Sequence, residues 1–336
     1  MDKITAQAEL LFNRLSKRYR HLKKWAKRTG TNAFRLYDRD IPEIPLVLEL
    51  YDDAVSGAVF KRHFEKEKAD PRYVDEDSWL TAMKTSVSQA LNISEDHIFL
   101  KERQRMKQRH NTGSQYSKIS AKNFYRDVHE LDMTFRVNLS DYLDTGLFLD
   151  ARKKRSLIRH EATGKRVLNL FAYTCSLSVC AAKGGALQVD SVDLSNTYLE
   201  WGKVNFALNG LEACDNFNFV QSDVIRYLAE AGKKPLRWDI IILDPPSFSN
   251  SKKTRITLDI RRDYVDLIQK CLSLLSPGGV LWFSSNAKGV KIDPEDFPEA
   301  NLEVKDMGKE LMDEDFKVKR MPVCYKYQLA TVKSPN

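Results

Sequence analysis

Three acidic residues stand where an apolar run of the sequence ends. Asp193 closes one alternating run, Asp223 follows the run 216–220, and Asp244 follows Trp238–Leu243. In an open α/β sheet the carboxyl ends of the strands meet at one edge, and ligands bind there. We therefore expect the three carboxylates beside one ligand. Asp193 suits a ribose diol, and Asp223 suits the exocyclic amine of an adenine.

The most specific pattern is Asp244-Pro245-Pro246-Ser247-Phe248. Prolines at a strand exit cannot extend the ladder and they restrict the backbone, so the Asp244 carboxylate and the Pro245 carbonyl are held rigidly. The aromatic ring of Phe248 can stack on a planar base, and Asn286 can help to orient it. The pattern predicts methyl transfer to a base, with these four as catalytic residues, although such a segment can also be a plain strand-ending turn. No G-x-G-x-x-G or Walker lysine is present, which disfavours NAD and ATP.

Alternating elements surround these residues. Arg166–Asp193 has the pattern strand, polar elbow, small-residue helix and strand, and the alternation continues to a closing hairpin near residues 316–318 and 325–331. This spacing predicts an α/β, doubly wound Rossmann-like sheet. We expect a basic amphipathic helix over residues 1–30, a small α+β domain over 31–128 and the main domain over 129–336. Residues 141–155 lead into the main domain, where they can form a lid or wall.

Composition limits the possible partners. The 336 residues carry a net charge of +8 with a pI near 9.0, which favours a polyanionic partner. No apolar run is long enough to span a membrane, and the N-terminus lacks a signal-peptide core. The five cysteines and six histidines show no metal-ligand spacing. We therefore expect a reduced, cytoplasmic protein without a metal site.

Positive charge is concentrated in the helix at residues 3–28 and in the segment 101–126, which contains few acids. A helix or loop of this kind can be a solvated surface, but two segments of the same sign favour RNA contact. The predicted RNA-binding residues, which include two lysines that follow the proline motif, are Arg14, Lys17, Arg18, Lys24, Arg103, Arg105, Lys107, Arg109, Tyr116, Lys252 and Lys253.

Several longer motifs resemble one family. They include Asp141–Asp150 (DYLDTGLFLD), Leu168–Thr174 (LNLFAYT), Asp193–Trp201 (DLSNTYLEW) and Asp244–Lys252 (DPPSFSNSK). The chain resembles the class I S-adenosylmethionine-dependent 23S rRNA methyltransferases, and within them the RlmK-type half of the bifunctional RlmKL family, which methylates guanine N7. The resemblance spans nearly the whole chain.

The resemblance implies a helical linker, a small β-β-α-β-β domain and a Rossmann-like methyltransferase domain. It also implies S-adenosyl-L-methionine as cofactor, S-adenosyl-L-homocysteine as product, and a guanine in helix 74 of 23S rRNA, free or in a large-subunit precursor, as target. The implied cofactor-binding residues are Phe148, Arg152, Asn169, Phe171, Ala172, Tyr173, Thr174, Asp193, Leu194, Ser195, Ser222, Asp223, Val224 and Asp244.

Three features depart from that family. Cys175 stands where the family has a glycine, so we expect a tighter or shifted cofactor loop. Ala151 replaces the histidine of FLDHR, and we expect the protein to work without the N-terminal guanine-N2-methylating half of the bifunctional family. The basic helix and loop would then supply the RNA affinity.

Residue type separates the possible reactions. Methylation at C5 of cytosine requires a cysteine nucleophile, but Phe283-Ser284-Ser285-Asn286 follows the relevant strand. Guanine N7 has a lone pair and needs only correct placement against the methyl donor. Two alternatives remain open: methylation of an exocyclic amine of guanine (N2) or adenine (N6), and a non-enzymatic RNA-binding protein with a degenerate cofactor fold.

Overall fold

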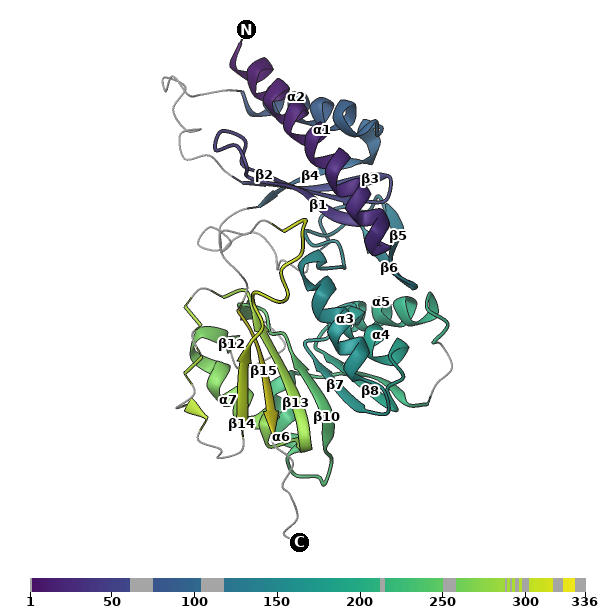
Figure 1. Cartoon of the computed structure of the whole chain (residues 1–336), viewed down its shortest axis with the longest axis vertical. Helices are drawn as coiled ribbons and strands as arrows, with labels where there is room; N and C mark the ends of the chain where they lie inside the picture. Colours follow the sequence, from purple (N-terminus) through teal and green to yellow (C-terminus); the bar gives the residue numbers. More distant parts are fainter. Residues whose placement is uncertain are drawn as a thin grey trace. The chain divides into compact units, whose positions relative to one another are not determined.

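The chain forms two compact units in the computed structural model (Figure 1): Met1–Leu149 with Glu314–Lys317, and Asp150–Asp313 with Val318–Asn336. The boundary predicted between residues 128 and 129 falls inside strand β5 (Tyr125–Glu130). The structure describes residues 2–60, 75–103, 118–211, 215–249, 258–287, 289–290, 292–293, 296–297, 302–316 and 323–329.

The first unit begins with the predicted basic helix, α1 (Lys3–Thr29). Asp2 caps its start by accepting a hydrogen bond from the Thr5 amide at 2.9 Å, and Gly30 ends it with a left-handed φ of 66°. The helix buries an apolar stripe that includes Leu11, Leu15 and Leu22, while most of its cationic side chains are exposed. The amphipathic helix predicted from the sequence is confirmed.

A four-stranded sheet packs beneath α1 and α2 (Figure 1). Its strand order is β1 (Ala33–Asp38), β2 (Leu46–Tyr51), β3 (Ala54–Phe60) and β4 (Ile98–Arg103). Helix α2 (Glu76–Leu91) connects β3 to β4 through the short helix η1 (Glu95–His97). Three strands therefore precede α2, one more than the β-β-α-β-β order. β5 and β6 (Met133–Asn138) form a separate antiparallel hairpin, and β5 begins within the segment predicted as a basic loop.

The second unit contains a seven-stranded sheet of order β14-β15-β13-β10-β7-β8-β9. Its strands are β7 (Arg166–Leu170), β8 (Gln188–Asp193), β9 (Phe217–Gln221), β10 (Trp238–Leu243), β13 (Leu275–Ser285), β14 (Leu302–Asp306) and β15 (Val323–Leu329). The five from β9 to β13 in this order are parallel, whereas β15 is antiparallel to both of its neighbours. The predicted doubly wound α/β fold is confirmed.

In the predicted closing hairpin the second strand corresponds to β15, but its partners are β14 and β13, and residues 317 and 318 of the first predicted strand lie outside the described residues. Phe316 is buried in the first unit, where the guanidinium of Arg35 lies 4.3 Å from the centre of its ring. Phe316 and Val318 alternate with lysines in the sequence, and such alternation predicts a strand whichever unit buries the aromatic ring.

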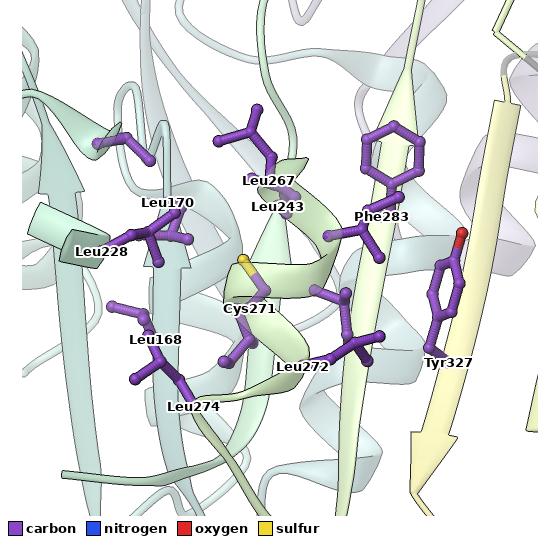
Figure 2. Packing of buried hydrophobic residues seen from close by; sticks show 14 of the residues in the cluster. Leu168, Leu170, Leu228, Leu243, Leu267, Cys271, Leu272, Leu274, Phe283 and Tyr327 are labelled. Carbon is purple, nitrogen blue, oxygen red and sulfur yellow. The ribbon is translucent and has the colours of Figure 1, made fainter. Parts of the chain in front are cut away.

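Helices cover both faces of the large sheet (Figure 1). Helices α3 (Arg152–Glu161), α4 (Ser176–Lys183) and α5 (Asn196–Ala207) pack in sequence on one face, and α6 (Val224–Ala231) packs with α7 (Ile260–Leu272) on the other. Figure 2 shows the core beneath α6 and α7, where Leu168, Leu170 and Leu243 of the strands meet Leu228 and Cys271 of the helices. This core keeps the sheet rigid, and the three acidic residues lie at the ends of its strands.

Candidate active site

The carboxyl ends of the parallel strands bring the predicted residues to one edge of the sheet. The strand register places Leu243 beside Leu170, and Leu170 beside Val192. The next residues, Asp244, Phe171 and Asp193, therefore follow neighbouring strands in that order. Ser222 continues the row, because its amide donates to the carbonyl of Asp193 at 3.0 Å.

The loop after β7 has an unusual backbone. Phe171, Tyr173 and Cys175 all have positive φ, at 57°, 50° and 59°, and they alternate with ordinary residues. The Tyr173 amide donates to Oδ2 of Asp193 at 2.9 Å, and the Tyr173 ring packs edge-on against Tyr198 at 4.5 Å. The loop is thereby attached to the end of β8, next to the carboxylate expected to bind ribose.

Cys175 adopts the backbone conformation that favours glycine, with φ 59° and ψ 26°. Its buried side chain faces Gly202 of α5: a Cβ atom built on Gly202 would lie 2.4 Å from the sulfur of Cys175. The loop therefore keeps a glycine-like path, and Gly202 provides the space for the thiol. The structure explains how a cysteine is accommodated at this position.

Asp193 can accept hydrogen bonds from a ribose. Its Oδ1 accepts from the Ser195 amide at 2.8 Å and its Oδ2 from the Tyr173 amide at 2.9 Å. Burial raises the pKa of Asp193, although these backbone donors oppose the rise. Each carboxylate oxygen has a second lone pair, so the group can still accept from ribose hydroxyls.

Asp223 caps α6, because its Oδ1 accepts from the Arg226 amide at 3.0 Å. This bond leaves Oδ2 for a ligand amine and aligns the carboxylate with the helix start. Val224 behind it is buried, and the Leu194 carbonyl accepts from the side-chain amide of Gln221 at 3.3 Å. These contacts join the ends of β8 and β9.

Asp244 is paired with a lysine that sequence reasoning missed. The Lys154 ammonium on α3 donates to Oδ2 of Asp244 at 2.6 Å and to the Ser284 hydroxyl at 2.7 Å. The side chain of Lys154 is 6% exposed and that of Asp244 is 35% exposed. Burial alone would lower the pKa of Lys154, but Asp244 and Cys324 outweigh it and raise the pKa above its usual value. In the sequence, the only hint that Lys154 belongs to the site is its position two residues after Arg152 of the family motif.

Cys324 of β15 lies near the same pair, since its register partner on β13 is Ser284. Its side chain is 2% exposed. Burial, together with Asp244 and Asp306, raises the pKa of Cys324 to about 12, although Lys154 opposes this. At neutral pH it is a buried neutral thiol, which is a poor nucleophile.

The remaining predicted cofactor and catalytic residues have varied surroundings. The Arg152 guanidinium donates to Asp313 at 3.0 Å, and the Asn169 amide donates to the Ser178 hydroxyl at 2.8 Å inside the unit. Thr174 is buried, and its carbonyl accepts from Asn205 at 2.8 Å. Asn169 and the Thr174 backbone thus hold the sheet edge and the loop from within.

Other predicted residues lie at surfaces or strand ends. Ala172 and Pro245 are buried, and Asn286 is exposed just after β13. Phe148 is 48% exposed and belongs to the first unit. Phe248 begins the short strand β11 (Phe248–Ser249), which pairs with β12 (Leu258–Asp259).

The predicted RNA-binding residues fall into two groups. Lys17 and Lys24 are exposed on α1. Arg14, Arg18 and Arg103 are engaged within the first unit: Arg14 pairs with Asp40, buried Arg18 reaches the carbonyls of Leu36 and Asp315, and Arg103 pairs with Asp144. The remaining predicted RNA-binding residues lie outside the described residues: Arg105, Lys107, Arg109, Tyr116, Lys252 and Lys253.

The part of the chain that the structure describes contains no group of His, Cys, Asp and Glu arranged to hold a metal ion. It also contains no helix long and apolar enough to cross a membrane.

Comparison with known proteins identifies the family. The sequence profile of the S-adenosylmethionine-dependent methyltransferases matches residues 60–302. The chain belongs to this family. A crystal structure of SMU.776 complexed with SAH has the same fold, with a TM-score of 0.73 at 24% identity, and the match covers 96% of this chain and 82% of that chain.

Two curated methyltransferases are more similar in sequence. The chain is 41% identical over 315 residues to ribosomal RNA large subunit methyltransferase K of Neisseria meningitidis, covering 93% of this chain and 85% of that protein. It is 41% identical over 310 residues to ribosomal RNA large subunit methyltransferase K/L of Allochromatium vinosum, covering 92% of this chain. The match spans 41% of that longer K/L protein.

S-adenosylmethionine is thus the cofactor of this methyltransferase, and the site residues fit it. Asp193 offers carboxylate oxygens for the ribose, and the left-handed loop 171–175 lies beside it. Asp244 stands one strand further along the edge, where an acceptor base can meet the methyl donor.

Proposed function

We propose that this methyltransferase forms 7-methylguanosine in 23S ribosomal RNA, in the helix 74 region. The placement of Asp244 beside the cofactor loop, with no reactive thiol near it among the described residues, is the observation that carries the proposal. The names of the similar K and K/L proteins support a large-subunit rRNA substrate.

The buried thiol argues against methylation at cytosine C5. That reaction needs a thiolate to add to the ring before methyl transfer. Cys324 approaches Asp244, but burial and neighbouring acids keep it protonated at neutral pH. Ser284 and Ser285 occupy the end of β13, where a hydroxyl cannot replace a thiolate. A purine nitrogen with its own lone pair is the better acceptor.

The residues of the chain would act on the base mainly by orienting it. A guanine leaves its stack in the RNA and enters beside Asp244. Asp244 accepts an N–H of the guanine, and the Pro245 carbonyl, Phe248 and Asn286 complete the recognition. The bound cofactor supplies an electrophilic methyl group. N7 needs no general base, so placement in line with that methyl group supplies most of the catalysis.

The carboxylate also has an electrostatic role in the product. As the bond from N7 to the methyl carbon forms, the carbon–sulfur bond breaks and its electron pair remains on sulfur. The positive charge then lies on the guanine ring. Asp244, which accepts from the base in this scheme, would stabilise that charge.

The test combines product identification with one substitution. The purified chain, S-adenosylmethionine and a 23S rRNA transcript are incubated, and the RNA is digested to nucleosides for mass spectrometry. We expect 7-methylguanosine, and we expect Asp244→Asn to lower turnover at least 100-fold while the affinity for S-adenosylmethionine, measured by calorimetry, stays within threefold. Wild-type turnover in Asp244→Asn would contradict the role of this carboxylate.

The runner-up is methylation of an exocyclic amine, because the Asp-Pro-Pro-aromatic motif also suits an amine whose proton must leave. N2-methylguanosine or N6-methyladenosine in the digest would establish it in place of the N7 product. A chain that binds RNA but transfers no methyl group to any transcript would instead support a binding protein.

A further inference from the structure

The chain contains a buried ion pair at the candidate acceptor site that joins elements distant in sequence. Lys154 lies near the start of α3, Asp244 follows β10, and Ser284 lies near the end of β13. The ammonium contacts both partners within 2.7 Å. Most of the lysine is inaccessible, whereas a third of the Asp244 side chain remains exposed.

This arrangement gives the two carboxylate oxygens of Asp244 different surroundings. Oδ2 accepts from Lys154, and within the described part of the chain Oδ1 has no such donor. A carboxylate with one oxygen occupied has its rotation restricted, since turning it would break a charge-assisted bond. The remaining oxygen is then presented in one direction, toward a base.

Asp244 is the main partner of the Lys154 ammonium. The other groups facing this ammonium are Asp150, the neutral thiol of Cys324 and the Ser284 hydroxyl, and Asp306 acts on Cys324 from β14. Asp244 is the acid in direct contact with it.

We infer that Lys154 is a positioning residue: it orients Asp244, so that one carboxylate oxygen selects a base with an N–H donor. The inference rests on the proposed function, in which Asp244 meets the base. Lys154 itself touches neither the base nor the cofactor in this scheme.

The test measures how Lys154 and Asp244 depend on each other. Methyl transfer to RNA is followed at pH 7 with a labelled methyl group in Lys154→Met, Asp244→Asn and the double variant. In Lys154→Met we expect kcat to fall about 100-fold, with KM for RNA and the affinity for S-adenosylmethionine within threefold, because only the orientation of Asp244 is lost.

Two further variants complete the design. The double variant should be no slower than Asp244→Asn alone, since the lysine acts through that carboxylate. Lys154→Arg keeps a cation that can donate to Asp244, and its kcat should stay within tenfold of wild type. Lys270→Met, which removes a lysine paired with Asp266 on the surface of α7, is the matched control and should stay within twofold.

The outcomes are distinct. A Lys154→Met enzyme whose KM for RNA and affinity for S-adenosylmethionine change as much as its kcat would show that the lysine only supports packing, and multiplying losses in the double variant would show that it acts independently of Asp244. If Lys154→Met does not fold, the kcat of Lys154→Arg decides, and a loss far beyond tenfold would contradict the inference. Because every rate counts transferred methyl groups, a product other than 7-methylguanosine would overturn the proposed function without affecting this comparison.

Discussion

Cys175 and Gly202 occupy one small volume between the cofactor loop and α5. A cysteine in the left-handed region costs about 1–2 kcal/mol relative to glycine. Burial of its side chain in the space that Gly202 leaves offsets part of this cost. The two positions therefore depend on each other, and neither can be judged alone.

We predict that Gly202→Ala destabilises the chain by about 1–2 kcal/mol, since the clash with the Cys175 sulfur outweighs the gain in helix propensity. Cys175→Gly should be nearly neutral, because relief of backbone strain offsets the lost packing. The double variant should be at least about 1 kcal/mol more stable than Gly202→Ala alone, since the new methyl group fills the vacated space.

Urea unfolding of the four proteins measures this coupling. Strictly additive effects would contradict it. Cys175→Gly should also retain its affinity for S-adenosylmethionine, because glycine preserves the left-handed backbone of the loop.

At the scale of elements, the segment after β6 is held together by one buried acid. Asp141 accepts from the Ser140 hydroxyl at 2.7 Å, from the Asn123 amide at 3.1 Å and from Asn138 at 3.2 Å, and pairs with Lys118 at 3.2 Å. The first acid of the family motif 141–150 is thus structural. It attaches the hairpin β5–β6 to the segment that leads into it.

These contacts make the stability of the fold depend on pH. Burial would raise the pKa of Asp141, but the hydrogen bonds from Ser140, Asn138 and Asn123, with Lys118, lower the pKa to about 2. Because the pKa of Asp141 in the folded chain lies below that of an ordinary aspartate, the carboxylate stabilises the fold above about pH 4, and this contribution is lost as the pH falls toward 2.

We therefore expect Asp141→Asn to lower the free energy of unfolding by about 2 kcal/mol at pH 7, since one pKa unit corresponds to about 1.4 kcal/mol. The difference from wild type should shrink below pH 4 and vanish near pH 2. Urea titrations at several pH values test this, with Asp96→Asn, an exposed change in η1, as a control within about 0.5 kcal/mol. A penalty independent of pH would mean that the charge of Asp141 is unimportant.

Other elements show how far periodicity could be followed. The apolar run Trp238–Leu243 forms β10 with the same bounds, because polar residues flank it. β5 begins inside the basic segment 101–126, where the sequence predicts a loop. This strand contains charged residues, and its pairing with β6 determines it.

At the scale of the whole molecule, some cationic side chains are exposed to solvent, whereas others are already paired with a carboxylate. On α1 the cationic residues Lys17, Lys24 and Lys27 are exposed, whereas Arg14 is held by Asp40 at 2.6 Å. Only a cation that is not already neutralised releases counterions when it meets a phosphate. Net charge alone overstates the surface available to RNA.

We predict that Lys17→Ala and Lys24→Ala each weaken RNA binding and reduce the slope of log K against log salt by about 0.7–0.9, the value for one phosphate contact. Arg14→Ala should leave the slope nearly unchanged, because Asp40 already neutralises that guanidinium. Fluorescence anisotropy with a labelled rRNA fragment at several salt concentrations measures the slopes. An equal loss in all three variants would show that the ion pair opens on RNA binding.

The sequence by itself determined the fold class and the positions of Asp193, Asp223 and Asp244 at strand ends. Apolar periodicity and proline act locally, so they mark where a strand stops whatever surrounds it. Only the tertiary structure decided which side chains meet there. Lys154 reaches Asp244 across 90 residues of sequence, Phe316 joins the first unit, and Arg14 and Arg103 are paired. Long side chains find their partners through packing of distant elements, and no local pattern records that.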